Sequence, residues 1–261
     1  MDEIKPPKDF DWQYWINRWD RMQERYLVRR AERFALIVRL IRETQENISR
    51  VLNLGCGPGS LMVPVLEAFS NSEVVGIDFD PTILLLAKAR LSKFGKRAKI
   101  ILADLRDKSW FRNVPKTIDA VISATALHWL MPDELETLYH QIAKILNPNG
   151  IFLNADHVGS DFPPIQKAWE KHRQEMRNQE GQGNADDWDS FWKAYAKALG
   201  INIDEVHQSS INKWAGGVEE GLPLAWHFDK LRESGFSSVD CFWRCDCDAI
   251  YGGIYVKDNN K

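Results

Sequence analysis

The stretch Val51-Leu-Asn-Leu-Gly-Cys-Gly-Pro-Gly-Ser60 joins a short apolar run to a turn that contains three glycines. Glycines let the backbone bend tightly and lie close to a ligand, where any side chain would intrude. Ser60 is expected to cap the helix that follows. The stretch predicts a strand, a ligand-facing turn and a helix, although the glycine pattern alone also occurs in turns that bind nothing.

Apolar runs and helical patterns alternate after this turn, which is typical of a parallel sheet with crossover helices. Strands are predicted at 51–54, 73–78, 99–103, 118–123 and 150–154, and around 238–247 and 249–256. The last two are close enough in sequence to form a hairpin. The expected fold is α/β: a doubly wound, Rossmann-like, mostly parallel seven-stranded sheet with an antiparallel C-terminal edge hairpin and a helical lid.

Changes of texture along the chain predict four segments: an N-terminal helical lid at 1–49, a Rossmann-like core at 50–157, an inserted helical cap at 158–223, and a C-terminal helix with the edge hairpin at 224–261. Most of the eleven tryptophans lie outside the core segment, in the leader, the insertion and its exit: Trp12, Trp15, Trp19, Trp169, Trp188, Trp192, Trp214 and Trp226. The aromatic excess and the surplus length therefore coincide in the lid and the cap.

The 261 residues carry a net charge of −3, with 44% hydrophobic and 27% charged positions. These values exclude a disordered or collagen-like chain, and they argue against nucleic acid as the main partner, because phosphate binding needs a concentrated basic surface. Acids near the N-terminus and the lack of a long apolar run predict a cytoplasmic protein that does not enter a membrane. Five leader arginines are spaced to share one helical side, facing solvent or an anion: Arg18, Arg21, Arg25, Arg29 and Arg33.

Two acidic residues follow the predicted second and third strands. Asp78 lies 19 residues after Gly59, where a carboxylate can accept both hydroxyls of an adenosine ribose. Asp104 follows the third strand, where it can accept hydrogen bonds from an adenine amino group. Because the carboxyl ends of parallel strands meet at one edge of a sheet, the glycine turn and both acids are expected to border one crevice.

On these motifs the sequence resembles the class I S-adenosylmethionine-dependent methyltransferases of the small-molecule type, over residues 50–157 and 224–256. The resemblance implies S-adenosyl-L-methionine as the cofactor. Asn53 stands where many members of the family have an acid, but its amide oxygen can still accept a hydrogen bond from the cofactor's ammonium. The implied cofactor contacts are Asn53, Gly55, Cys56, Gly57, Pro58, Gly59, Asp78, Phe79, Ala103, Asp104, Leu105, Ser123 and Ala124.

Three candidate bases lie beside the predicted crevice: His128, Asp156 and His157. A neutral histidine suits proton removal near pH 7, whereas each of the three is also typical of a structural residue at a strand end. The aromatic residues expected to meet the acceptor are Trp15, Trp19, Trp129 and Trp192. No metal site is expected, since Cys245 and Cys247 at alternating positions of one strand are more typical of a packed, reduced core than of a zinc site.

The leading hypothesis is methyl transfer to an oxygen or nitrogen of a small aromatic or carboxylated metabolite, by alignment with general-base help. A methyltransferase that acts on RNA or protein is the alternative within this class. An NAD(P)-dependent oxidoreductase and a non-catalytic cofactor-binding module are the alternatives outside it. The sequence does not indicate an oligomeric state.

Overall fold

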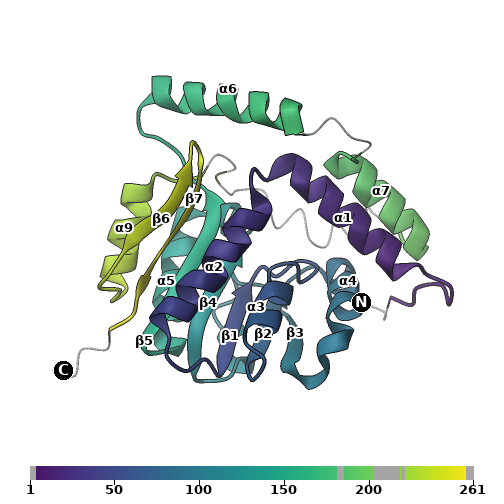
Figure 1. Ribbon diagram of the computed structural model, residues 1–261, viewed down its shortest axis with the longest axis horizontal. Helices are drawn as coiled ribbons and strands as arrows, with labels where there is room; N and C mark the ends of the chain where they lie inside the picture. Colours follow the sequence, from purple (N-terminus) through teal and green to yellow (C-terminus); the bar gives the residue numbers. More distant parts are fainter. Residues whose placement is uncertain (1–3, 181–184, 203–217, 219–220, 257–261) are drawn as a thin grey trace.

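The computed structural model describes residues 4–180, 185–202, 218 and 221–256, and within them one seven-stranded sheet (Figure 1). Its strands are β1 (Arg50–Leu54), β2 (Glu73–Asp78), β3 (Ala98–Leu102), β4 (Ile118–Ala124), β5 (Leu146–His157), β6 (Asp240–Cys245) and β7 (Asp248–Ile254). The strand order is β3-β2-β1-β4-β5-β7-β6. The first five strands are parallel, and β7 runs antiparallel to both β5 and β6. The predicted fold class is therefore confirmed, including the edge hairpin.

The described helices are α1 (Trp12–Tyr26), α2 (Arg30–Thr44), α3 (Met62–Ala68), α4 (Pro81–Leu91), α5 (Pro132–Ile145), α6 (Pro163–Glu180), α7 (Trp188–Leu199) and α9 (Leu224–Glu233). Local sequence explains where several of them begin. The Asp80 carboxylate accepts hydrogen bonds from the backbone of Thr82 and Ile83, and Pro81 fits the first turn of α4. In the part of the chain that the structure describes, no helix is long and apolar enough to cross a membrane.

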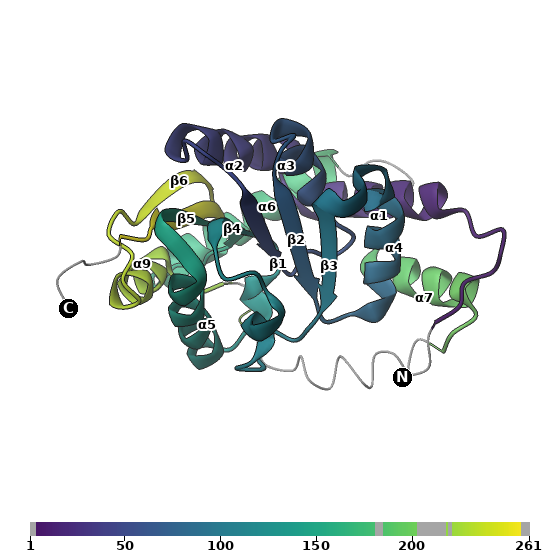
Figure 2. The same cartoon turned by 90° about the horizontal axis from the view of Figure 1, so that it is seen from below.

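Helices cover both faces of the sheet (Figure 2). On one face, Ile37 and Ile41 of α2 join side chains of α3 and α4 in a core against β1 and β4. On the other, Leu138 and Tyr139 of α5 pack with Leu231 of α9. The two layers bury the apolar strands and leave the carboxyl ends of the parallel strands for loops.

A third hydrophobic cluster, rich in aromatic residues and here called the aromatic cluster, joins α1 and α7 to α4, away from the sheet itself. It contains Trp15 and Trp19 of α1 and Phe191 and Tyr195 of α7. The rings of Trp15 and Tyr195 have centroids 5.2 Å apart, and those of Trp19 and Phe191 5.3 Å apart. Packing of these rings holds the two helices together over the carboxyl ends of the strands.

The structure corrects the predicted boundary of the N-terminal lid at residue 49. The chain leaves α1 at Leu27, and Arg29 adopts a left-handed conformation with φ of 53° before α2 begins. Because α2 then packs on the sheet, it belongs to the core and only α1 joins the aromatic cluster. The five leader arginines consequently do not share one helical side, and Arg33 is buried against Asp248.

Two further expectations concern the cap and the hairpin. Of the predicted cap, α6 and α7 are described, whereas 181–184, 203–217 with Trp214, and 219–220 lie outside the described residues. Cys245 ends β6 and Cys247 lies in the turn before β7, so the two thiols do not alternate along one strand as predicted. Both are free thiols, and Cys247 is buried.

Candidate functional site

A cavity of about 760 Å³ opens at the carboxyl ends of β1, β2 and β4. One side is formed by the glycine turn and the ends of β2 and β3, and the other by α1, the start of α2, and α7. A volume of this size suits a small-molecule site, and its place in the sheet is the usual ligand crevice of doubly wound folds.

The glycine turn is shaped by three residues with positive φ, Gly55 at 58°, Gly57 at 51° and Gly59 at 77°. A Cβ atom on Gly55 would lie 2.3 Å from the Cβ of Ala126, whereas one on Gly57 would meet nothing within 4 Å. Because Gly57 also lines the cavity, a ligand can approach its backbone closely.

The other four residues of the turn differ in their surroundings. Cys56 and Pro58 line the cavity as predicted, but Gly59 packs against Leu91 of α4 and is not among the described lining residues. Ser60 does not cap α3: its hydroxyl bonds to Asp20 of α1 and accepts a hydrogen bond from Arg90.

Asp78 presents a buried carboxylate to the cavity. Its Oδ2 accepts a hydrogen bond of 2.8 Å from the Gly57 backbone, and its Oδ1 accepts one of 3.0 Å from Asp80. Burial raises the pKa of Asp78 to about 6, and the backbone donors only partly oppose this shift. Additional hydroxyl donors would stabilise the ionised form, so the site is suited to a diol.

Asn53 reaches the cavity from β1 and is 1% exposed. Its amide nitrogen is 3.3 Å from the carbonyl oxygen of Ile122, while its Oδ1 has no hydrogen-bond partner among the described residues. A buried acceptor without a partner is costly, and a cationic donor of a ligand would satisfy it.

At the end of β3, Ala103, Asp104 and Leu105 line the cavity, as does Phe79 after β2. The structure modifies the prediction for Asp104, because the Arg106 guanidinium donates to both of its oxygens at 2.9 and 2.6 Å. Arg106 itself lines the cavity. Sequence reasoning missed this pairing, and the only available signal was a cation two positions after the acid.

At the end of β4, Ala124 and Thr125 line the cavity, but Ser123 does not face it. Ser123 is fully buried, and its hydroxyl donates to the carbonyl oxygen of Leu54 at 2.9 Å. Its place therefore corrects the predicted cofactor contact: Ser123 ties β4 to β1.

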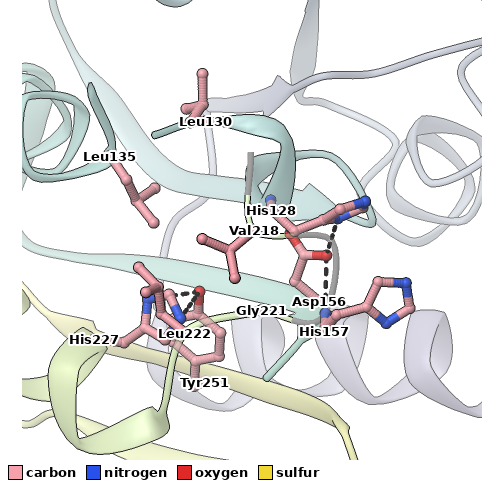
Figure 3. A pocket seen from close by; sticks show the side chains of 10 residues that line it. All are labelled: His128, Leu130, Leu135, Asp156, His157, Val218, Gly221, Leu222, His227 and Tyr251. Carbon is pink, nitrogen blue, oxygen red and sulfur yellow. Dashed lines mark hydrogen bonds and ion pairs between the residues drawn. The ribbon is translucent and has the colours of Figure 1, made fainter. Parts of the chain in front are cut away.

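His128 and Asp156 form a buried pair beside the cavity (Figure 3). His128 Nδ1 lies 2.6 Å from Asp156 Oδ1, and the backbone N–H groups of Leu127 and His128 donate to Oδ2. Burial alone would raise the pKa of Asp156, but His128 and His157 together hold it well below its ordinary value. An ionised Asp156 fixes the proton of His128 on Nδ1, which leaves Nε2 as an acceptor.

His157 has a carboxylate partner of its own. Its Nδ1 lies 2.9 Å from Asp248 Oδ1, and Arg33 approaches the same oxygen at 3.5 Å. Burial raises the pKa of Asp248, but the bond from His157 and the charge of Arg33 lower it overall. Sequence reasoning missed Asp248 and Arg33, because both lie far from His157 along the chain.

A chain of polar side chains continues from Asp156 into the interior. Asn154 donates to the Tyr251 hydroxyl at 2.8 Å, and the Tyr139 hydroxyl is 2.8 Å from His227 Nδ1. Asp156, Tyr251 and His227 border a water-sized space of about 10 Å³ (Figure 3). Burial lowers the pKa of His227 to about 4, so its imidazole is neutral near pH 7.

Some of the tryptophans line the cavity, and others pack in the aromatic cluster between α1 and α7. Trp19, Trp129 and Trp192 line the cavity, as predicted, and Trp188 does so as well although it was not predicted. Trp15 is not among the described lining residues, because it packs between Phe10, Phe191 and Tyr195. This packing does not support the expected contact of Trp15 with an acceptor.

Among the described residues there is no group of three or more His, Cys, Asp or Glu side chains placed to hold a metal ion. The cysteine of the glycine turn offers no nucleophile either, since burial raises the pKa of the Cys56 thiol well above its ordinary value. The polar and aromatic groups that line the cavity are carboxylates, imidazoles, guanidinium groups and aromatic rings.

Comparison with known proteins shows that the chain is similar to methyltransferases. A family model described as a methyltransferase domain matches residues 51–150. The chain is 26% identical to a carboxy-S-adenosyl-L-methionine synthase of Shewanella amazonensis, over 76% of this chain and 72% of that protein. It is 32% identical to a trans-aconitate 2-methyltransferase of Escherichia coli, over 48% of this chain and 46% of that protein. The chain thus spans about half the length of several curated relatives that it matches.

Solved structures show the same fold. A putative O-methyltransferase from Nostoc punctiforme superposes with a TM-score of 0.58 at 15% identity, covering 93% of this chain and 59% of that one. PigF with SAH superposes with a TM-score of 0.54 at 15% identity, covering 95% of this chain and 63% of that one. At these identities the likeness supports the fold, and the site must be argued from its own residues.

Proposed function

The chain belongs to the class I S-adenosylmethionine-dependent methyltransferases, and on this premise we propose that it moves a methyl group to an oxygen or nitrogen of a small metabolite. One observation carries the proposal: a single cavity joins the glycine turn and Asp78 to His128 and the lid tryptophans. Cofactor and acceptor sites therefore adjoin without a barrier between them.

The residues present fit S-adenosyl-L-methionine, the cofactor of the family. Asp78 would accept the ribose hydroxyls, and the unpartnered Oδ1 of Asn53 would accept from the ammonium. Gly57 leaves space for the methionine part to approach the backbone. When bound, this cofactor supplies an electrophilic methyl group on a positively charged sulfur.

The protein itself must align the acceptor, exclude water and remove a proton. Alignment of two reactants can contribute about 7–11 kcal/mol. We assign proton removal to His128: its Nε2 takes the proton from a hydroxyl or protonated amine of the substrate. Asp156 then stabilises the imidazolium that forms. We assign water exclusion to α1 and α7, whose Trp19, Trp188 and Trp192 line the cavity.

Two considerations support a small acceptor. The names of the relatives include trans-aconitate and carboxy-S-adenosyl-L-methionine, both small molecules. The cavity is also partly enclosed by the aromatic side chains of α1 and α7, a setting that favours a compact ligand with an apolar part.

The test is incubation with methyl-labelled cofactor and size-separated fractions of a cell lysate, followed by mass identification of the labelled product. Label in a low-mass compound, lost with Asp78→Ala, supports the proposal. Label only in RNA or protein would replace the acceptor class. Cofactor binding without transfer to any fraction would favour the non-catalytic module, and binding of NAD(P)H in place of the cofactor would favour the oxidoreductase.

A further inference from the structure

Arg30 brings a guanidinium group to the cavity wall from the start of α2. The side chain is 13% exposed, lines the cavity, and lies 4.8 Å from the ring centroid of Phe34. Its Nη1 is 3.3 Å from Asp20 Oδ1 of α1. Its Nε is buried and has no hydrogen-bond partner among the described residues.

The carboxylate of Asp20 is shared. Arg90 of α4 donates to Asp20 Oδ2 at 2.9 Å and to the Ser60 hydroxyl at 2.7 Å. Two guanidinium groups thus converge on one carboxylate, with the exposed Glu24 as a more distant acid. The cluster carries an excess positive charge at the wall of a cavity, and burial, followed by Arg90, lowers the pKa of Arg30 against the effect of Asp20.

A buried cation without a matching anion is unfavourable, and a planar guanidinium has a fixed set of donors that matches the two oxygens of a carboxylate. Asp20 occupies Nη1, which leaves the edge that includes Nε. Phe34 lies against the guanidinium of Arg30, and Trp19 and Tyr26 line the same cavity. An anion bound in the cavity would compensate the excess positive charge of this cluster.

We propose that Arg30 forms a carboxylate-binding subsite of this cavity. The inference rests on the proposed function, because its ligand has two sources there: the methionine carboxylate of the cofactor or a carboxylate of the acceptor. In the first case Arg30 fixes the cofactor's amino-acid end against Asn53. In the second it restricts acceptors to acids and sets their orientation toward His128.

Calorimetry with S-adenosylhomocysteine (SAH) and with 5′-methylthioadenosine, which lacks the amino-acid end, distinguishes the sources. If the carboxylate is the cofactor's, Arg30→Gln weakens SAH by about 10- to 100-fold and leaves methylthioadenosine unchanged. If it is the acceptor's, SAH is unchanged, and the SAH-loaded wild type binds members of a carboxylate panel (benzoate, phenylacetate, trans-aconitate, citrate) that Arg30→Gln no longer binds. Tryptophan fluorescence reports the panel, since Trp19, Trp188 and Trp192 line the cavity.

Arg39→Gln is the matched control, because Arg39 lies on the same helix, is exposed and pairs only with Glu43 among the described ion pairs. Arg30→Lys keeps the positive charge but loses the paired donors of the guanidinium, so its affinity is expected to lie between those of wild type and Arg30→Gln. Thermal melting checks that all variants fold. Equal SAH affinity in wild type and Arg30→Gln, with no panel carboxylate bound by wild type, overturns the subsite alone. No SAH binding by wild type would overturn the proposed function itself.

Discussion

The rings of His128 and His157 have centroids 4.8 Å apart at one wall of the cavity, and each is held through Nδ1 by its own buried carboxylate. The two carboxylates differ in whether they also pair with an arginine. Arg33 neutralises Asp248, whereas Asp156 forms no ion pair with a described lysine or arginine. Because Asp248 is shared between His157 and Arg33, whereas Asp156 orients His128, we assign the base to His128 and a hydrogen-bonding role to His157.

This difference predicts unequal effects of matched substitutions. His128→Gln should lower kcat by about 10²- to 10⁴-fold, the usual contribution of a general base, with unchanged SAH affinity. His157→Gln should mainly raise the KM of the acceptor. Steady-state kinetics with the lysate fraction that yields labelled product measures kcat and KM for the two variants. Equal losses in kcat would contradict the assignment.

Gly57→Val should abolish cofactor binding, because the new side chain would project into the cavity. Gly95→Val is a close control: Gly95 has φ of 56° against 51° for Gly57, and a Cβ at either position meets nothing within 4 Å. Both variants place a β-branched residue at positive φ, but only Gly57→Val should lose SAH in calorimetry. Retained SAH affinity would mean that the turn does not face the cofactor.

Asp78 should make cofactor binding depend on pH. Its pKa of about 6 in the free protein means that the carboxylate is protonated as the pH falls below 6, and the protonated form is a poorer acceptor for ribose hydroxyls. SAH affinity is expected to weaken about tenfold from pH 7 to pH 5, with proton release on binding near pH 6. Asp78→Asn should bind weakly at every pH, and a parallel decline in that variant would assign the pH dependence elsewhere.

His227 should destabilise the fold in acid. Its pKa is about 4 in the folded protein against about 6.5 when unfolded. The unfolded chain therefore takes up a proton first as the pH falls from 6.5 to 4, and up to about 3 kcal/mol of stability is lost. Urea unfolding should show the wild-type advantage over His227→Gln shrinking across this interval. A constant difference between the two proteins would refute the buried neutral imidazole.

Substitutions of Trp188 and Trp15 should have different effects: the first on acceptor binding and the second on the stability of the protein. Trp188 is 41% exposed and lines the cavity, so Trp188→Ala is expected to raise the acceptor KM with little change in unfolding free energy. Trp15 is buried in the aromatic cluster, so Trp15→Ala should cost about 3–5 kcal/mol. Chemical unfolding and kinetics on both variants test this division, and the opposite pattern would place Trp15 in the acceptor site.

Local patterns in the sequence were sufficient for the sheet and the glycine turn. Strand periodicity, the left-handed positions at Gly55 and Gly57, and the acid at the end of β2 depend on neighbours along the chain. Right-handed crossovers then bring those strand ends to one edge. For this reason the sequence alone was enough to predict the fold class, and most of the residues expected to contact the cofactor line the cavity.

Only the tertiary structure decided which side chains face the cavity and how their charges are paired. Asp248 reaches His157 across 91 positions and Arg33 across 215, and Arg30 meets Arg90 through a carboxylate on a third helix. Trp188 lines the cavity and Trp15 does not, because the packing of α1 on α7 decides which rings face the cavity. Such contacts depend on how separate elements pack together, and the spacing of residues within one element does not determine that packing.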